Sequence, residues 1–90
     1  MKNKEVIYNF LLQKKECKNA SKNLEYKKGT SKNITDILYN YNVKIACIFN
    51  NKVVINKKYL HYSKTTQTNI NNIIRLADDL GYNVYYALIG

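Results

Sequence analysis

The sequence contains no proline, only three glycines and only two cysteines. With so few forced breaks in the chain, regular helices and strands are favoured over extended loops. Cys17 and Cys47 form no CxxC pair and no cysteine–histidine cluster, which excludes the common structural zinc motifs. Both lie in apolar patterns, so we expect buried, reduced thiols and no metal site. A disulfide would require an oxidising compartment.

The side chains on which enzymes depend are scarce and scattered. The single histidine, His61, has Ser63 two residues away, but no carboxylate stands nearby in sequence to orient the ring. The acidic residues occur singly except for Asp78 and Asp79, which would diverge by about 100° on a helix. No glycine-rich loop is present to hold phosphate. We therefore expect no enzymatic activity and no cofactor.

Long hydrophobic runs are also missing. No stretch approaches the roughly 20 apolar residues that a membrane span requires. The apolar run from Val6 to Leu12 is interrupted by Asn9 and is not followed by a small-residue cleavage site of the signal-peptide type. Ninety residues, of which 46% are hydrophobic, suit a single domain over residues 1–90. We expect a cytoplasmic protein that does not bind membranes.

Lysine is what the chain has in excess. Fifteen basic residues against six acidic ones give a net charge of +9, of which residues 1–33 carry +6, residues 34–66 carry +4 and residues 67–90 carry −1. Such a field attracts nucleic acid, an anionic membrane or an acidic protein surface. Arg75 is the only bidentate donor, so a nucleic-acid partner would be read with little sequence selectivity. The alternative explanation is AT-rich codon usage, which favours Asn, Lys, Ile and Tyr alike.

The first segment, residues 4–25, shows the pattern of an amphipathic helix, because apolar residues recur on one face at helical spacing. These residues are Val6, Phe10, Cys17 and Leu24. On such a helix Lys15, Lys18 and Lys22 would form one stripe beside the apolar face.

The middle of the chain predicts strands. Residues 34–41 are ambiguous between a helical turn and a strand. Residues 43–49 and 53–55 are rich in β-formers, and Asn50-Asn51 between them predicts a hairpin turn because Asn tolerates positive φ. A second turn would then lead into a third strand at residues 58–62.

A second helix follows, with Thr65 or Thr66 as its expected N-cap, an apolar face at 3.6-residue spacing, and Gly81 as its stop. Residues 83–89 have β-formers on both faces, which is typical of a strand that lies inside a sheet or is covered on its far face. If that strand is an exposed edge, it would offer a surface for homodimerisation. The expected fold is α+β in two layers: an antiparallel sheet with two helices packed on it, in the order α-β-β-β-α-β.

Tyrosines stand next to lysines, above all at residues 57–64. Tyrosine can stack on nucleic-acid bases while lysine neutralises phosphate, and the same pairing occurs at protein interfaces. The alternative is a set of half-buried sheet tyrosines with lysines beside them. The candidate partner-binding or nucleic-acid-binding residues are Lys15, Lys18, Lys22, Lys44, Lys57, Lys58, Tyr59, Tyr62 and Lys64.

Two stretches, LYNYNVKIACIFNNKVVI and YSKTTQTNINNII, resemble a group of small phage and mobile-element proteins. That group shares a Ser-Tyr-Asn-Thr-Pro-Val-Ala strand, a hairpin, and a Tyr-Ser-x-Thr-Thr-x-x-His-Ile helix start. Val43-Lys44 replaces Thr-Pro, and Asn69 replaces His. The positions that carry the resemblance are Tyr41, Asn42, Ala46, Tyr62, Ser63, Thr65, Thr66 and Ile70.

The resemblance implies a phage-encoded accessory protein that acts in the host cytoplasm, and inhibitors of CRISPR effectors are one class of that kind. Together with the basic, tyrosine-rich segments, it predicts a non-enzymatic protein that binds and blocks a host protein or ribonucleoprotein machine. The alternative is a direct, weakly selective binder of RNA or DNA, similar to a double-stranded-RNA module in its α-β-β-β-α order.

Overall fold

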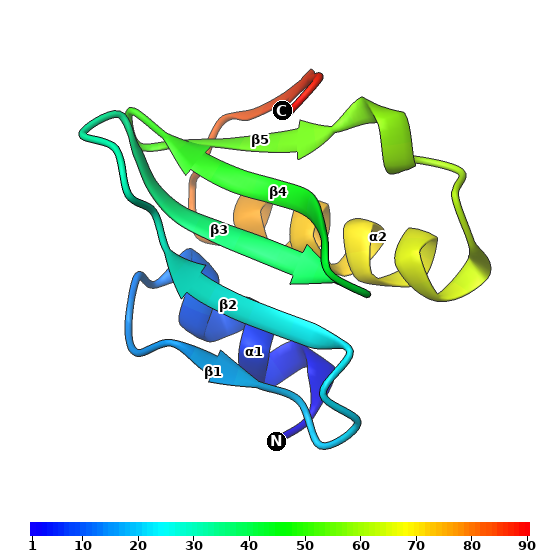
Figure 1. The fold of residues 1–90 in the computed structure, drawn as a ribbon. Helices are drawn as coiled ribbons and strands as arrows, with labels where there is room; N and C mark the ends of the chain where they lie inside the picture. Colours follow the sequence, from blue (N-terminus) through cyan, green and yellow to red (C-terminus); the bar gives the residue numbers. More distant parts are fainter.

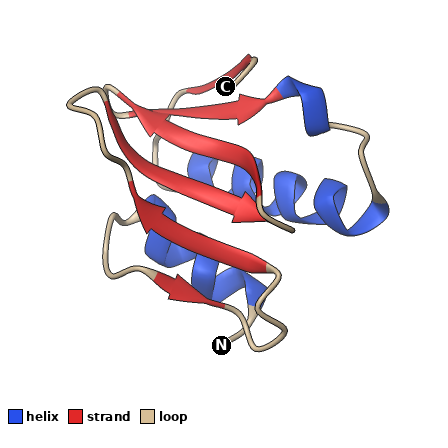
Figure 2. Cartoon of the chain, viewed as in Figure 1, coloured by secondary structure: helices blue, strands red, loops and turns tan.

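Two helices cover one face of a single six-stranded sheet (Figures 1 and 2). The computed structural model describes all residues, 1–90. In chain order the elements are α1 (Asn3–Leu11), β1 (Cys17–Lys18), β2 (Leu24–Lys28), β3 (Ile34–Asn40), β4 (Val43–Phe49), β5 (Lys52–Asn56), the 3-10 helix η1 (Lys57–Tyr59), α2 (Lys64–Asp79) and β6 (Val84–Ala87). This arrangement confirms the expected α+β class. Neither helix has the length and apolar character needed to cross a membrane.

The strands lie side by side in sequence order, from β1 to β6. The first four pairs are antiparallel, and only β5 and β6 are parallel. A parallel pair requires a crossover connection, which α2 supplies by running back along the helical face of the sheet. The sheet is therefore mixed, although mostly antiparallel.

Two tight turns connect the central strands. Tyr41 and Asn42 have φ of 51° and 65°, and Asn50 and Asn51 have φ of 50° and 63°. Two-residue turns with positive φ at both positions match the twist of a β-hairpin. The expected turn at Asn50-Asn51 is confirmed, and residues 34–40, which the sequence left ambiguous, form strand β3.

The expected helix over residues 4–25 is wrong beyond its first half, because α1 ends at Leu11. Gln13 and Lys22 have φ of 54° and 59°, and the chain between them forms β1 and the turn into β2. Cys17 contacts the core from a strand, not from a helix. Pairing with β2 and β3 outweighs the weak helix propensity of this Asn- and Ser-containing stretch.

The expected third strand at residues 58–62 is also wrong. The side chain of Asn56 accepts a hydrogen bond from the backbone nitrogen of Lys58 at 3.2 Å and starts the 3-10 turn η1 there. The N-cap of α2 is Ser63 and neither of the expected threonines: its hydroxyl accepts from the backbone nitrogen of Thr66 at 3.1 Å.

The core lies between the helices and the sheet. Phe10 of α1 packs edge-to-face on Tyr26 of β2, with ring centroids 5.8 Å apart. The remaining core residues come from both helices and four strands. They are Val6, Ile7, Leu11, Leu24, Leu38, Ile45, Ala46, Ile48, Val53, Ile55, Ile70, Ile73, Leu76 and Ala77.

Two β-bulges interrupt the pairing of β3 with β4. Thr35 on β3 and Ile45 on β4 have no residue opposite them in the ladder. Side chains alternate between the two faces along a strand. An extra residue at a bulge therefore makes the side chains beyond it point to the face opposite to the one that regular alternation predicts. The bulges thereby turn Ile34 and Lys44 away from the core and onto the open face of the sheet, the face opposite the helices.

Candidate binding surfaces

Buried amides join four segments at one end of the sheet, the right-hand end in Figure 1. Asn40, at the end of β3, accepts from the Thr66 hydroxyl at 2.8 Å and donates to the backbone oxygen of Asn23 at 2.9 Å. Asn3, at the start of α1, accepts from Asn19 at 2.7 Å and donates to Asn69 of α2 at 3.2 Å. These bonds hold the starts of both helices, the β1–β2 turn and the end of β3 together.

A further buried amide, Asn56, extends this end to β4 and β5. Its side chain donates to the backbone oxygen of Lys44 at 2.7 Å. Since Lys44 follows Val43, which pairs with Asn40, the end of β5 and η1 lie beside the amide network.

Seven lysines lie at this end of the molecule, which we call the basic end: Lys2, Lys4, Lys22, Lys44, Lys57, Lys58 and Lys64. All are exposed except Lys44, which is half-buried. The only carboxylate among them is Glu5, which accepts from the backbone nitrogen of Lys2 at 2.9 Å. Neither of the chain's two ion pairs involves one of the seven. The basic end therefore holds six of the chain's nine net positive charges.

Two backbone features add to this field. Both helices begin at the basic end, so the positive ends of their dipoles point towards it. Between the two helix starts lies a polar hollow of about 310 Å³, lined by Asn3, Lys64, Thr65, Thr68 and Asn69.

Tyrosines accompany the lysines. Tyr59 is half-buried against the core, and its ring packs edge-to-face on that of Tyr62 with centroids 5.2 Å apart. The Lys58 amine lies 5.7 Å from the centre of the Tyr59 ring. Tyr62 and Tyr41 remain 62% and 53% exposed, so part of each ring is accessible to a partner.

The structure brings most of the sequence-predicted residues together. Lys22, Lys44, Lys57, Lys58, Tyr59, Tyr62 and Lys64 all lie at the basic end.

Lys15 and Lys18 do not join them, and the expected helical stripe is wrong because neither lies on a helix. Lys15 lies at the opposite end, in the α1–β1 connection, and Lys18 of β1 pairs with Glu25 at 3.5 Å. Sequence reasoning missed Lys2 and Lys4, whose only signal is that they flank Asn3 at the helix start.

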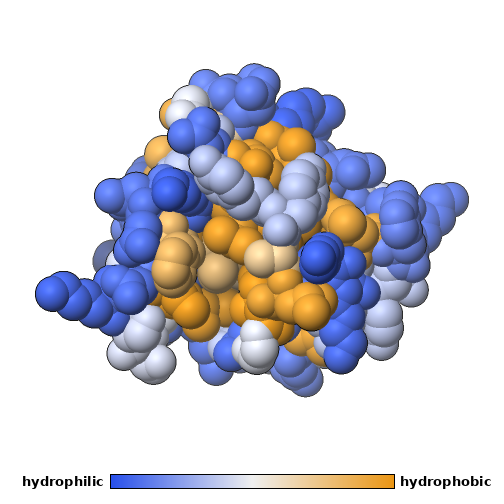
Figure 3. Space-filling model, turned by 90° about the horizontal axis from the view of Figure 1, so that it is seen from above, coloured by the Kyte–Doolittle hydropathy of each residue, from blue (hydrophilic) through white to orange (hydrophobic).

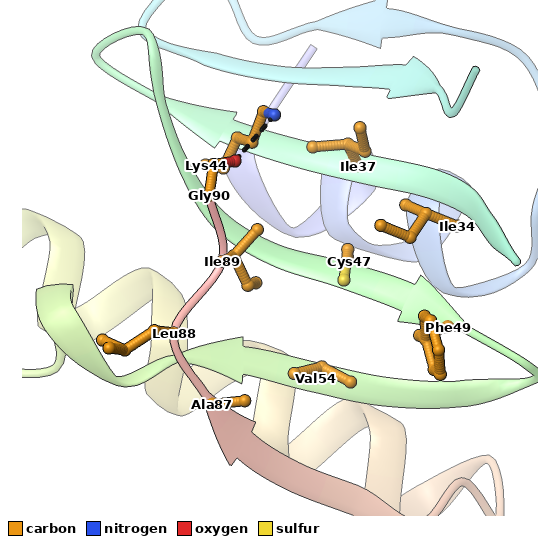
Figure 4. A pocket seen from close by; sticks show the side chains of 10 residues that line it. All are labelled: Ile34, Ile37, Lys44, Cys47, Phe49, Val54, Ala87, Leu88, Ile89 and Gly90. Carbon is orange, nitrogen blue, oxygen red and sulfur yellow. Dashed lines mark hydrogen bonds between the residues drawn. The ribbon is translucent and has the colours of Figure 1, made fainter. Parts of the chain in front are cut away.

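The open face of the sheet carries a second candidate surface, which sequence reasoning did not identify. Residues 87–90 cross this face and leave a groove of about 330 Å³ beside them (Figure 4). Seen from above relative to Figure 1, apolar side chains gather in one patch bordered by hydrophilic ones (Figure 3). The groove is lined by Ile34, Ile37, Lys44, Cys47, Phe49, Val54, Ala87, Leu88, Ile89 and Gly90. One feature of the sequence indicated an apolar open face: strand β4 carries apolar side chains on both of its faces.

Few bonds hold the tail over the groove. The Lys44 amine donates to the backbone oxygen of Gly90 at 2.9 Å, while the two bonds between Asn56 and the Ile89 backbone are long, at 3.4 and 3.5 Å. Ile89 is half-buried to one side of Cys47, whereas Leu88 turns away and is 70% exposed (Figure 4).

The two cysteines are free thiols in this structure. Cys47 is buried in the groove floor and Cys17 is half-buried at the core edge; burial raises the pKa of both.

The opposite end of the sheet holds a buried carboxylate. Asp36, only 1% exposed, accepts hydrogen bonds from the Tyr26 hydroxyl, from Thr35 at 2.7 Å and from Gln13 at 2.8 Å, and it pairs with Lys28 at 3.2 Å. Burial would raise the pKa of Asp36, but these hydrogen bonds outweigh burial and lower it below its ordinary value. Burial, followed by the bond to Asp36, raises the pKa of Tyr26.

Comparison with protein-family models, with curated proteins and with solved structures finds no match to the chain. The resemblance to phage and mobile-element proteins stays a prediction.

Proposed function

We propose that this chain is a non-enzymatic accessory protein that docks on a ribonucleoprotein by gripping the phosphate backbone of its RNA with the basic end. One observation carries the proposal: seven lysines from five separate segments lie at one end of the molecule with a single acidic side chain among them, and none of the seven forms an ion pair with an acidic side chain. Unpaired lysines release phosphate counterions on contact, which drives nucleic-acid binding without sequence reading.

The composition of the basic end favours phosphate over an acidic protein surface. Protein interfaces are enriched in arginine and depleted in lysine, whereas the cations here are all lysine. Tyr62 and Tyr41 would stack on exposed bases, and the helix starts would face phosphate oxygens. The phage context suggested by the resemblance would make the target a host machine that the protein blocks.

The test compares two triple charge reversals of equal size. Lys57→Glu, Lys58→Glu and Lys64→Glu change the basic end, while Lys14→Glu, Lys15→Glu and Lys32→Glu change exposed lysines at the opposite end. Binding to a labelled RNA duplex of about 20 base pairs is measured by fluorescence anisotropy between about 50 and about 200 mM salt. We expect the first variant to lose at least about 100-fold more affinity than the second, and to show a shallower salt slope.

Equal losses in the two variants would show that only total charge matters and would contradict the proposal. So would an affinity that does not change with salt. Capture of partners from host lysate, with and without ribonuclease, then tests the ribonucleoprotein: we expect protein partners to be lost when the RNA is digested.

A further inference from the structure

The groove on the open face is a second, apolar site that the proposed RNA contact does not use. We infer that it binds an extended acidic segment of a partner protein, which places one large apolar side chain between Ile89 and Phe49 and its flanking carboxylates on Lys27 and Lys52. Only Lys44 belongs to both the groove and the basic end.

The groove is built by departures from regular sheet geometry. The bulges at Thr35 and Ile45 put Ile34 at one side of it and Lys44 at the other. Bulges recur where a sheet re-aims side chains towards a ligand. Its volume of about 330 Å³ and its mostly apolar lining, with one charged residue, match the character of sites that take small apolar groups.

The chain's own tail indicates the chemistry of the occupant. Ile89 lies beside Cys47 in the groove, and the oxygen of Gly90 accepts a hydrogen bond from the Lys44 amine at 2.9 Å (Figure 4). An apolar side chain followed by an oxygen acceptor is thus already accommodated at one side of the groove. The unfilled part, between Ile89 and Phe49, offers the same apolar floor to a second segment.

The charges around the unfilled part select an acidic segment. Lys27 lies across from Ile37, and Lys52 lies across from Phe49, so both stand on the open face beside the groove. Their amines are held over aromatic rings, Lys27 at 5.9 Å from the centre of Tyr39 and Lys52 at 5.6 Å from that of Tyr85.

The single acidic side chain on this face, that of Glu25, is paired with Lys18. Neither Lys27 nor Lys52 forms an ion pair within the chain, so the border beside the unfilled part of the groove is cationic.

The experiment selects binders without assuming their sequence. The folded chain is used to enrich peptides from a random library of about 12 residues, a length that spans the face when extended. We expect enriched peptides to carry one Leu, Ile, Phe or Met flanked by Asp or Glu. Enrichment of peptides without this pattern would overturn the inference.

Three variants locate the binding of an enriched peptide, measured by fluorescence anisotropy. Ile37→Asp in the lining should weaken binding about 10- to 100-fold. The double variant Lys27→Glu and Lys52→Glu, at exposed positions where folding is not at risk, should weaken it at least about tenfold. Leu12→Ala removes an exposed apolar side chain at the end of α1, on the opposite side of the sheet from the groove, and should leave affinity within about twofold. Unchanged affinity in the double variant would overturn the inference even if Ile37→Asp fails to fold.

The result separates this site from the proposed RNA contact. The Ile37→Asp variant should bind the RNA duplex as the parent chain does, whereas the triple reversal of Lys57, Lys58 and Lys64 should still bind the enriched peptide. If sedimentation shows instead that the chain dimerises and that Ile37→Asp abolishes the dimer, a second copy fills the groove and the inference is wrong.

Discussion

The two ends of the sheet solve the problem of buried polar groups in opposite ways. At the basic end the buried groups are neutral amides and a hydroxyl, centred on Asn40 and Asn69. At the opposite end the centre is a buried carboxylate, Asp36, to which Lys28 is paired. The remaining acidic residues of that half, Glu16, Asp78 and Asp79, also lie there.

The difference shows how the chain keeps its positive charge concentrated. A buried carboxylate stabilises a network by recruiting a cation, and so cancels surface charge. Amides can satisfy each other and the backbone without any net charge. By using asparagines beneath the basic end, the fold joins four segments and leaves the lysines above them free.

Replacing the centre of the amide network should produce the largest effect on stability. Asn40→Leu removes the acceptor of Thr66 and the donor to Asn23, and leaves buried polar groups without partners. We expect the free energy of unfolding to fall by about 3 kcal/mol, measured by urea denaturation. The control is Asn71→Leu, an exposed position on α2, which should change it by less than about 0.5 kcal/mol. Similar losses in the two variants would show that the network does not hold the basic end.

The carboxylate at the opposite end should give a smaller, pH-dependent effect. Asp36→Asn removes the charge that accepts from Tyr26 and pairs with Lys28, and we expect a loss of about 2 kcal/mol at pH 7. Because folding lowers the pKa of Asp36, its contribution is present above the unfolded-state pKa of about 3.9 and is lost as pH falls through the lower folded-state pKa. The difference between parent and variant should therefore shrink below about pH 4 in acid unfolding. A constant difference from pH 7 to pH 2 would contradict this account.

The smallest effect is expected at the tip of the β3–β4 hairpin. Tyr41 has φ of 51°, which a bulky residue adopts at a penalty of about 1 kcal/mol. Tyr41→Asn should raise the free energy of unfolding by about 0.5–1 kcal/mol and, by removing an exposed ring, weaken RNA binding about fivefold. Asn42→Gly should stabilise the same turn and leave RNA binding unchanged. The two variants together distinguish relief of backbone strain from loss of the Tyr41 ring as a stacking surface. A loss of stability in Tyr41→Asn would show that the ring is structural.

The sequence predicted those elements that depend on residues close together along the chain. The Asn50-Asn51 turn, the apolar face of α2 and the stop at Gly81 all follow from residue types within a few positions. The segment from Leu12 to Tyr26 was mispredicted because Cys17 and Leu24, seven residues apart, fit a helix face as well as two strands that face the same core. Pairing with β3 decides between a helix and two strands. The spacing of residues within the segment does not encode this pairing.

The candidate surfaces divide in the same manner. The cluster at residues 57–64 is local and was visible in the sequence, whereas its union with Lys2, Lys4, Lys22 and Lys44 depends on how four segments pack. The groove depends on two bulges, and without the bulge at Ile45 strand alternation would place Lys44 with Ala46 and Ile48 in the core. The residue types at Thr35 and Ile45 do not indicate a bulge. The groove on the open face could therefore not be predicted from the sequence.

The parallel pairing of β5 with β6 has a consequence for how the chain folds. Strands β1 to β5 join neighbours along the chain, so they can form quickly by closing short loops. Strand β6 can pair with β5 only after the long connection through α2 has folded back onto the sheet. It has β5 as its neighbour on one side and no strand on the other. It should therefore assemble later than β3 and β4 and open more readily, with backbone amides that exchange with solvent sooner than those of these two central strands. Each such opening would carry the tail away with it and uncover the floor beneath.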